Sequence, residues 1–181
     1  MGSEQHIVGD VLRPRLHVIF CGTALGRTSA DAKAYYAHPR NLFWTTLHEV
    51  GLTTAGRPLA PSQYLQVLDF GIGLTDLCKF TSGNDRDLPP NAFDVAALRN
   101  KMEDHRPAFL AFTSRKAGQV FCGPTANLGW QDGALGSTRI YILPSTSPSA
   151  RWQWNENRHH WQILAEAVKQ ARLTSAQACH S

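Results

Sequence analysis

Residues 16–26 read LHVIFCGTALG, an apolar run from Leu16 to Cys21 that leads into a loop bounded by Gly22 and Gly26. A short apolar run followed by glycines predicts a buried strand with a tight exit from the sheet. A similar pair occurs much later, where Ile140 to Leu143 precedes PSTSPSARW (residues 144–152). Because ligands of parallel sheets bind beyond the carboxyl ends of the strands, both loops are expected to face one cleft.

Between these two segments, strand-like and helix-like stretches alternate. The patterns predict strands at 16–21, 66–70, 108–112 and 139–143, and helices at 41–50, 59–65, 92–105, 114–122 and 155–173. Residues 71–77, 82–90 and 123–136 are predicted as loops because they are rich in glycine or polar residues. This order predicts one α/β domain over residues 1–181, a three-layer α/β/α sandwich around a short, mostly parallel four-stranded sheet.

Composition narrows the class of protein. The chain has 181 residues, 43% of them hydrophobic, which suffices for a full core. No apolar run reaches the length of a membrane span, and the polar start predicts no secretory signal. We therefore expect a cytoplasmic protein of bacterial type that acts at the nucleoid. The four cysteines lack zinc or iron–sulfur spacing and are expected to be free thiols in a reducing compartment: Cys21, Cys78, Cys122 and Cys179.

A net charge of +4 is compatible with a polyanionic partner but common among other proteins. Six basic residues lie in or beside the loop segments, and this placement supports a nucleic-acid partner: Arg27, Lys33, Arg40, Arg139, Arg151 and Arg158.

The segment YYAHPRNLFW (residues 35–44) places four aromatic residues around a His-Pro turn. Core packing is the favoured interpretation for Phe43 and Trp44. Tyr36 precedes the turn and lies off the apolar stripe of the following helix, so it can offer a ring to a ligand. An aromatic ring beside a loop of free amides suits an enzyme that holds a flipped-out base by stacking and hydrogen bonds.

Taken together, the glycine loop, the Ala-His-Pro-x-Asn-x-Phe-Trp segment and Pro-Ser-Thr-Ser-Pro resemble motifs of the uracil-DNA glycosylase superfamily. The first two look like the mismatch-specific uracil branch, whereas the double tyrosine and the last motif look closer to the hypoxanthine-DNA glycosylase branch. The likeness runs from the strand at Leu16 to the last helix. It implies a metal-independent enzyme without cofactor, a monomer that binds DNA containing uracil or another deaminated base.

The resemblance also implies roles for individual residues. The base would be bound by Gly22, Thr23, Ala24, Tyr36 and Asn41; catalysis would rest on Asn41 and His38; and DNA phosphates would be held by Ser29, Ser145, Thr146, Ser147 and Arg151. In the mismatch-specific branch an asparagine that positions water stands where this chain has Ala24. The hypoxanthine branch relies instead on the asparagine of its His-Pro-x-Asn turn, here Asn41. The alternative for Asn41 is a cap of the following helix.

No carboxylate lies inside the first or third motif, although Asp31, Asp69 and Asp76 are near. N-glycosidic cleavage tolerates this, because oriented amides can stabilise a base that leaves as an anion. The intercalating leucine of the mismatch branch is replaced by Ala150, so Arg151 or Trp152 is expected to fill the gap in the duplex. His48, His159 and His160 lack partners at metal-ligand spacing and are expected to be structural.

The sequence therefore predicts a monofunctional DNA glycosylase that hydrolyses the bond between uracil and deoxyribose and leaves an abasic site. A hypoxanthine or mismatch-specific glycosylase is the near alternative. A non-catalytic binder of damaged or abasic DNA, favoured by Ala24, is the alternative from a different class. A nucleotide- or NAD-binding α/β domain fits the same fold, but this chain lacks Gly-x-Gly-x-x-Gly after the first strand.

Overall fold

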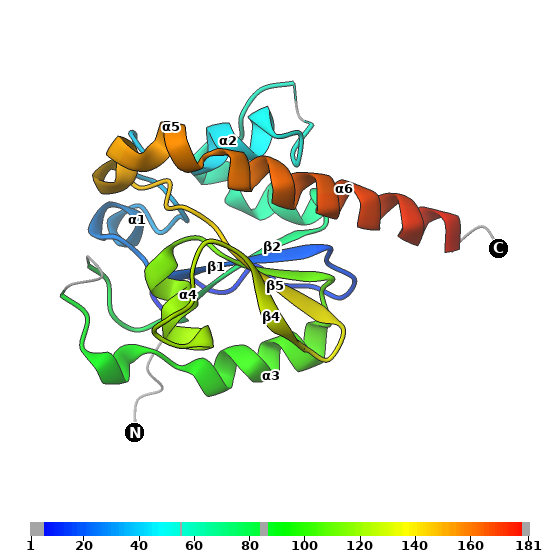
Figure 1. Ribbon diagram of the computed structural model, residues 1–181. Helices are drawn as coiled ribbons and strands as arrows, with labels where there is room; N and C mark the ends of the chain where they lie inside the picture. The colour runs from blue at the N-terminus through cyan, green and yellow to red at the C-terminus, as the bar shows by residue number, and fades with distance from the viewer. Residues whose placement is uncertain (1–5, 55, 84–86, 179–181) are drawn as a thin grey trace.

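The computed structural model describes residues 6–54, 56–83 and 87–178 (Figure 1). A five-stranded sheet has the order β2-β1-β3-β5-β4 and consists of β1 (Val18–Ala24), β2 (Ile72–Cys78), β3 (Phe109–Phe112), β4 (Gly129–Leu135) and β5 (Thr138–Ile142). All neighbouring strands are parallel except β4, which runs antiparallel to β5 at one edge. The predicted three-layer, mostly parallel architecture is confirmed, with five strands instead of four.

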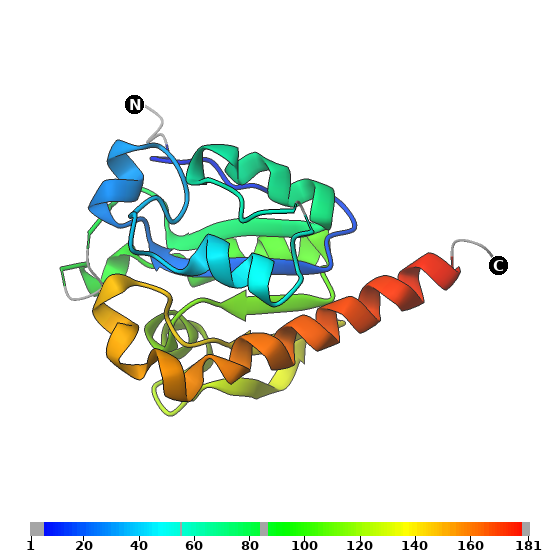
Figure 2. The same ribbon diagram turned by 90° about the horizontal axis from the view of Figure 1, so that it is seen from above.

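Helices cover both faces of this sheet (Figures 1 and 2). One face carries α2 (Phe43–Glu49), α6 (His159–Ala178) and the 3₁₀ helix η1 (Pro61–Phe70), and the other carries α3 (Val95–His105) and α4 (Arg115–Cys122). Shorter helices complete the chain: α1 (Arg27–Asp31), η2 (Pro90–Ala92), η3 (Pro148–Gln153) and α5 (Trp154–Asn157). Among the described residues, no helix is both long and apolar enough to cross a bilayer.

The side chains of β1 alternate between the two cores. Val18 and Phe20 pack into the cluster under α2 and α6, whereas Ile19 and Cys21 pack into the cluster under α3 and α4. All four are fully buried, as expected for a central parallel strand covered on both sides. Cys21 and Cys78 are buried free thiols and Cys122 is an exposed one, while Cys179 lies outside the described residues.

The second strand was predicted in the wrong place. Residues 66–70 belong to η1, and the strand is Ile72–Cys78, which overlaps the segment 71–77 predicted as a loop. Gly73 explains the error, because a Cβ there would lie 3.0 Å from the backbone oxygen of Val11. The N-terminal segment passes close by, and Val11 and Leu74 form an antiparallel bridge. The glycine therefore permits close packing of backbone against a strand and does not mark a turn.

The loop predicted at 123–136 contains β4, which the polar composition concealed. Its residues are intermediate or exposed, and Gly129 and Gly133 have φ values of 106° and 94°. The pairing with β5 shifts register between Trp130 and Ala134. A half-exposed, bulged edge strand does not show the apolar alternation that marks inner strands. Part of the loop predicted at 82–90 lies outside the described residues.

Trp161 connects the C-terminal helix to the sheet and to the last loop. Its side chain is fully buried and stacks on Phe20 of β1, with ring centroids 5.6 Å apart. Its indole nitrogen donates a hydrogen bond of 3.2 Å to the backbone oxygen of Pro144, at the start of the segment that follows β5. One side chain thus joins α6, β1 and this loop.

We predict that Trp161→Ala lowers the free energy of unfolding by about 3–5 kcal/mol, the usual range for removing a buried tryptophan. Ile163→Ala is the control, because Ile163 is on the same helix but 44% exposed, and it should change stability by less than about 1 kcal/mol. Denaturant unfolding measures both. Equal losses for the two variants would contradict the role given to Trp161.

Candidate active site

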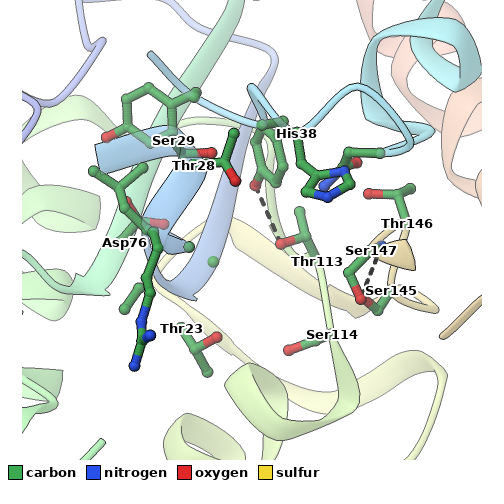
Figure 3. Close-up of a pocket in the computed structure, with 18 of the residues that line it drawn as sticks. Thr23, Thr28, Ser29, His38, Asp76, Thr113, Ser114, Ser145, Thr146 and Ser147 are labelled. Atoms are coloured by element: carbon green, nitrogen blue, oxygen red, sulfur yellow. Dashed lines mark hydrogen bonds between the residues drawn. The ribbon is translucent and has the colours of Figure 1, made fainter. Parts of the chain in front are cut away.

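The loops at the carboxyl ends of the strands enclose a cavity of about 770 Å³, a size typical of ligand sites. Figure 3 shows side chains from several loops converging on it. It is lined by Gly22, Thr23, Ala24, Leu25, Gly26, Arg27, Thr28, Ser29, Tyr35, Tyr36, His38, Asn41, Asp76, Gly83, Asp87, Thr113, Ser114, Ser145, Thr146, Ser147, Pro148 and Ser149. Every residue predicted for the site lines this cavity except Arg151, which is exposed on η3.

The floor of the cavity is determined by the register of three strands. Gly22 of β1 is paired with Asp76 of β2, and Thr113 directly follows β3, its backbone amide donating to the oxygen of Cys21 at 3.0 Å. A Cβ on Gly22 would lie 2.5 Å from Asp76 Oδ1. Glycine at this position therefore leaves room for the carboxyl group beside the strand.

Tyr36 forms part of the wall and is held from two sides. Its ring stacks on Phe43 with centroids 3.7 Å apart and an interplanar angle of 15°, and its hydroxyl lies 3.2 Å from Thr113 Oγ1. The backbone of Tyr36 has φ of 51°, a left-handed conformation that is uncommon for a non-glycine residue. Since one ring face is covered by Phe43, the ring is available to a ligand only on the side that lines the cavity.

Asn41 lies at the start of α2 and serves the helix as well as the cavity. Its side-chain oxygen accepts a hydrogen bond of 3.0 Å from the backbone nitrogen of Phe43. The oxygen is therefore engaged, as in the capping interpretation, and the side-chain NH₂ is the group that can donate to a ligand. Both roles raised by the sequence are compatible in one side chain.

His38 has a defined tautomer when neutral. Its Nδ1 accepts a hydrogen bond of 3.1 Å from the backbone nitrogen of Arg40, so the proton of a neutral ring is on Nε2. Because His38 lines the cavity, the Nε2–H group is a candidate donor to a ligand oxygen.

The Tyr-Tyr-Ala-His-Pro segment and the last loop are connected through α2. The backbone nitrogen of Leu42 donates to the oxygen of Thr146 at 3.0 Å. The Thr146 side chain is only 2% exposed, whereas Ser145 and Ser147 are partly exposed at the rim. Ser29 is 6% exposed, and its hydroxyl accepts a hydrogen bond of 3.0 Å from the backbone nitrogen of Ala37. In this structure Ser29 thus holds the loop that carries Tyr36.

A buried charge cluster lies behind the floor. Lys79 Nζ is 3.0 Å from an oxygen of Asp10, and Lys101 Nζ is 2.7 Å from the other. Burial alone would raise the pKa of Asp10, but Lys79 and Lys101 bring it below its usual value. Burial raises the pKa of Asp76 to about 6, although Lys79 opposes the shift. Burial also raises the pKa of Tyr36 well above its usual value.

Several cavity residues were not among the sequence predictions. Asp76 was missed because the second strand was misplaced, and Thr113 and Ser114 were missed because the segment after the third strand was interpreted only as the start of a helix. The signal for Thr113 was present, since it is the first polar residue after an apolar strand. Arg139, in contrast, lies at the opposite end of β5, with its guanidinium 3.9 Å from the Trp130 ring centroid.

Two of the three histidines considered for metal binding have other contacts, whereas His48 Nδ1 is buried without a hydrogen-bond partner among the described residues. His160 Nδ1 is 2.8 Å from the Tyr141 hydroxyl, and His159 Nδ1 is 2.9 Å from the oxygen of Glu156. Within the described ranges, no group of three or more His, Cys, Asp or Glu side chains is arranged to hold a metal ion.

Comparison with known proteins decides the family. Residues 10–169 match the family model of the uracil DNA glycosylase superfamily. The chain belongs to this superfamily. The fold is also similar to a solution NMR structure from Methanosarcina acetivorans named as a candidate uracil DNA glycosylase. That comparison has a TM-score of 0.64 and 20% identity over 90% of this chain and 96% of the other.

Superfamily membership agrees with the convergence of the three motifs on one cavity. The closeness to the mismatch-specific and hypoxanthine branches stays a prediction, as do the roles of individual residues.

We predict that the two roles of Asn41 can be separated by stability measurements. Asn41→Ala removes the acceptor for Phe43 N and should lower the free energy of unfolding by about 1 kcal/mol. Asn41→Asp keeps an acceptor and should stay within about 0.5 kcal/mol of the wild type. Chemical denaturation gives both values, and an Asn41→Ala protein as stable as the wild type would contradict the capping contact.

Proposed function

We propose that this protein is a monofunctional DNA glycosylase that flips a deaminated base, foremost uracil, out of DNA and hydrolyses its N-glycosidic bond. We further propose that it acts as a monomer in the cytoplasm and leaves an abasic site. The observation that carries the proposal is the single cavity lined by all three motifs of a superfamily member. Its volume of about 770 Å³ accommodates a nucleobase with its sugar.

In this proposal the base enters between the loop after β1 and the His-Pro turn. Tyr36 provides the aromatic surface on which the base lies, supported from behind by Phe43. Gly22, Thr23 and Ala24 bring their backbone amides to the base edge, because each lies at the carboxyl end of β1 and lines the cavity.

Catalysis then rests on donors that stabilise the departing base. The Asn41 NH₂ and the His38 Nε2–H group donate to base oxygens as negative charge develops there. Asn41 thereby replaces the polar side chain that is missing at Ala24, and the water reaches the sugar from the open side of the cavity. Preorganised donors of this kind contribute about 10²–10³ each to the rate.

Contacts to the DNA backbone are assigned to the rim. Ser145 and Ser147 are partly exposed there, and Arg151 follows on η3. Thr146 is buried, so we assign it no phosphate contact. It contributes through its backbone oxygen, which accepts a hydrogen bond from the Leu42 nitrogen. Trp152 is 79% exposed beside these residues and is the stronger candidate for the side chain that enters the gap in the duplex.

No lysine is among the described residues that line the cavity. A Schiff base with the sugar needs such an amine, and the nearby Lys79 is held by Asp10 and Tyr35. This favours simple hydrolysis over strand cleavage.

A second candidate function is non-catalytic binding of damaged or abasic DNA. Ala24 favours it, because a methyl group cannot orient the attacking water. The hydrogen-bond donors of Asn41 and His38 favour catalysis.

The deciding experiment is release of free base, in single turnover, from duplexes that contain uracil, hypoxanthine, thymine opposite guanine or ethenocytosine. We expect uracil release, unaffected by a chelator, and an intact abasic strand. Binding to abasic DNA without release of any base would support the second candidate and contradict the first. The affinity should fall steeply between about 50 and 200 mM salt, since phosphate contacts release counterions.

Asn41→Asp provides the sharpest test of catalysis. It keeps the cap but replaces the NH₂ donor with an acceptor, so the single-turnover rate should fall by at least about 10² while the fold is retained. Binding to abasic DNA is the control and should be nearly unchanged. An Asn41→Asp enzyme as fast as the wild type would remove Asn41 from the mechanism.

Tyr36 variants test the base pocket. Tyr36→Ala should weaken base interaction by about 1–3 kcal/mol, the range measured for stacking on aromatic side chains. Tyr36→Phe keeps the ring and loses only the contact with Thr113, so most activity should remain. Rates are compared per folded molecule after a thermal melt. Unchanged rates in a destabilised Tyr36→Ala protein would make Tyr36 a core residue only.

A further inference from the structure

The carboxyl group of Asp76 lies at the floor of the cavity. Its side chain is 4% exposed, lines the cavity and occupies the space beside Gly22 that a larger residue would fill. A Cβ on Gly22 would also lie 3.7 Å from the Thr113 hydroxyl, and the Tyr36 hydroxyl contacts Thr113. A base that enters alongside Tyr36 therefore directs its far edge, with its carbonyl and N–H groups, toward Asp76.

Asp76 is incompletely paired within the protein. Lys79 Nζ donates to the Tyr35 hydroxyl at 2.8 Å and lies 3.0 Å from Asp10, but it is 3.7 Å from Asp76 Oδ2, too far for a hydrogen bond. Within the described residues, Oδ2 is buried without a hydrogen-bond partner. Lys101 is engaged by Asp10 at 2.7 Å. The charges of Lys79 and Lys101 are thus paired mainly with Asp10 and not with Asp76.

This placement makes the neutral form of Asp76 accessible near physiological pH. Burial, together with the neighbouring Asp10 charge, raises the pKa of its carboxyl to about 6 against the opposing effect of Lys79 and Lys101. Three further titratable groups that interact with Asp76 stay uncharged, because burial raises the pKa of each: Cys21, Tyr35 and Tyr36.

We propose that Asp76 contacts the base as a neutral carboxylic acid, donating its O–H to a base carbonyl oxygen and accepting a hydrogen bond from the adjacent ring N–H. The proposal rests on the glycosylase function proposed above and names its substrate class. The class is bases with a carbonyl next to a ring N–H, the edge that deamination creates in uracil, hypoxanthine and xanthine. An acid can also pair with the reversed edge of cytosine, so Asp76 does not discriminate between them alone.

The neutral form matters because the base leaves with negative charge. A buried carboxylate beside a developing oxyanion would repel it, whereas an O–H donor at the same place stabilises it. As the charge on the base grows, the proton on Asp76 is held more tightly. The carboxyl group is then an electrostatic catalyst that works in one protonation state, and no proton has to be transferred.

The test is the pH dependence of single-turnover uracil release from about pH 5 to 9, with a thermal melt of each protein. In the wild type, the rate should fall by about tenfold per unit above the pKa of Asp76 in the complex. Asp76→Asn presents a donor and an acceptor at every pH, so its rate should lack this decline and remain within about tenfold of the wild-type maximum. Since Asp76→Asn retains His38, comparing the two profiles removes any contribution of the histidine.

Asp10→Asn is the matched control, because Asp10 shares Lys79 with Asp76 but does not line the cavity. Removing its charge lowers the pKa of Asp76, so the decline should begin at lower pH and not disappear. A wild-type rate that does not fall with rising pH, or a decline that persists unchanged in Asp76→Asn, overturns the proposal while base release still supports the glycosylase function.

If the wild type releases no base, the glycosylase proposal fails and Asp76 is tested by binding. The probes are duplexes with 2′-fluoro-2′-deoxyuridine at one position or, as the control, its N3-methylated form, which lacks the ring N–H. Recognition by the neutral acid is supported if the wild type binds the fluorinated uridine more tightly at low pH and Asp76→Asn shows no such pH dependence. Affinity that has the same pH dependence in both proteins overturns it.

Discussion

The position of β1 between β2 and β3 is the constraint on which the rest of the structure depends. Both faces of β1 are buried, which fixes the direction of each side chain, and hydrogen bonds on both edges fix the register. A shift of one residue would exchange Phe20 and Ile19 between two cores of different shape. The register therefore brings Gly22, Asp76 and Thr113 together at one sheet edge, although they are far apart in the sequence.

Around this edge the loops are held by a few specific contacts. Phe43 supports Tyr36 from behind, Ser29 binds the backbone of Ala37, and the amide of Leu42 binds the oxygen of Thr146. The cavity wall is thus supported by buried groups whose bonds are already formed before a ligand arrives. Such preorganisation is what electrostatic catalysis requires, because donors that are already oriented do not need to reorganise during the reaction.

The charge cluster behind the floor shows how two similar carboxylates acquire different properties. Asp10 receives both lysines at hydrogen-bonding distance and has a lowered pKa, whereas Asp76 receives neither and has a raised one. Both carboxyl groups are buried, but Asp76 is buried more completely, and Asp10 also accepts hydrogen bonds from Lys101 and Thr75. Burial therefore dominates for Asp76, whereas the neighbouring cations and donors dominate for Asp10. The same cluster that stabilises the N-terminal segment against the sheet thus determines the chemical state of a group in the cavity.

Much of the fold and of the candidate site could be predicted from local sequence patterns. Apolar runs located β1, β3 and β5, the Ser114 cap located α4, and ten of the eleven site residues predicted from the sequence line the cavity. Local patterns suffice there because strands buried on both faces and capped helices have strong short-range signatures. The tertiary structure alone decided that a glycine-rich segment is the strand β2, that a polar segment is the edge strand β4, and that Asp76 lies at the floor of the cavity. Each of these depends on which backbone or charge lies nearby in space, and residues distant in sequence determine that.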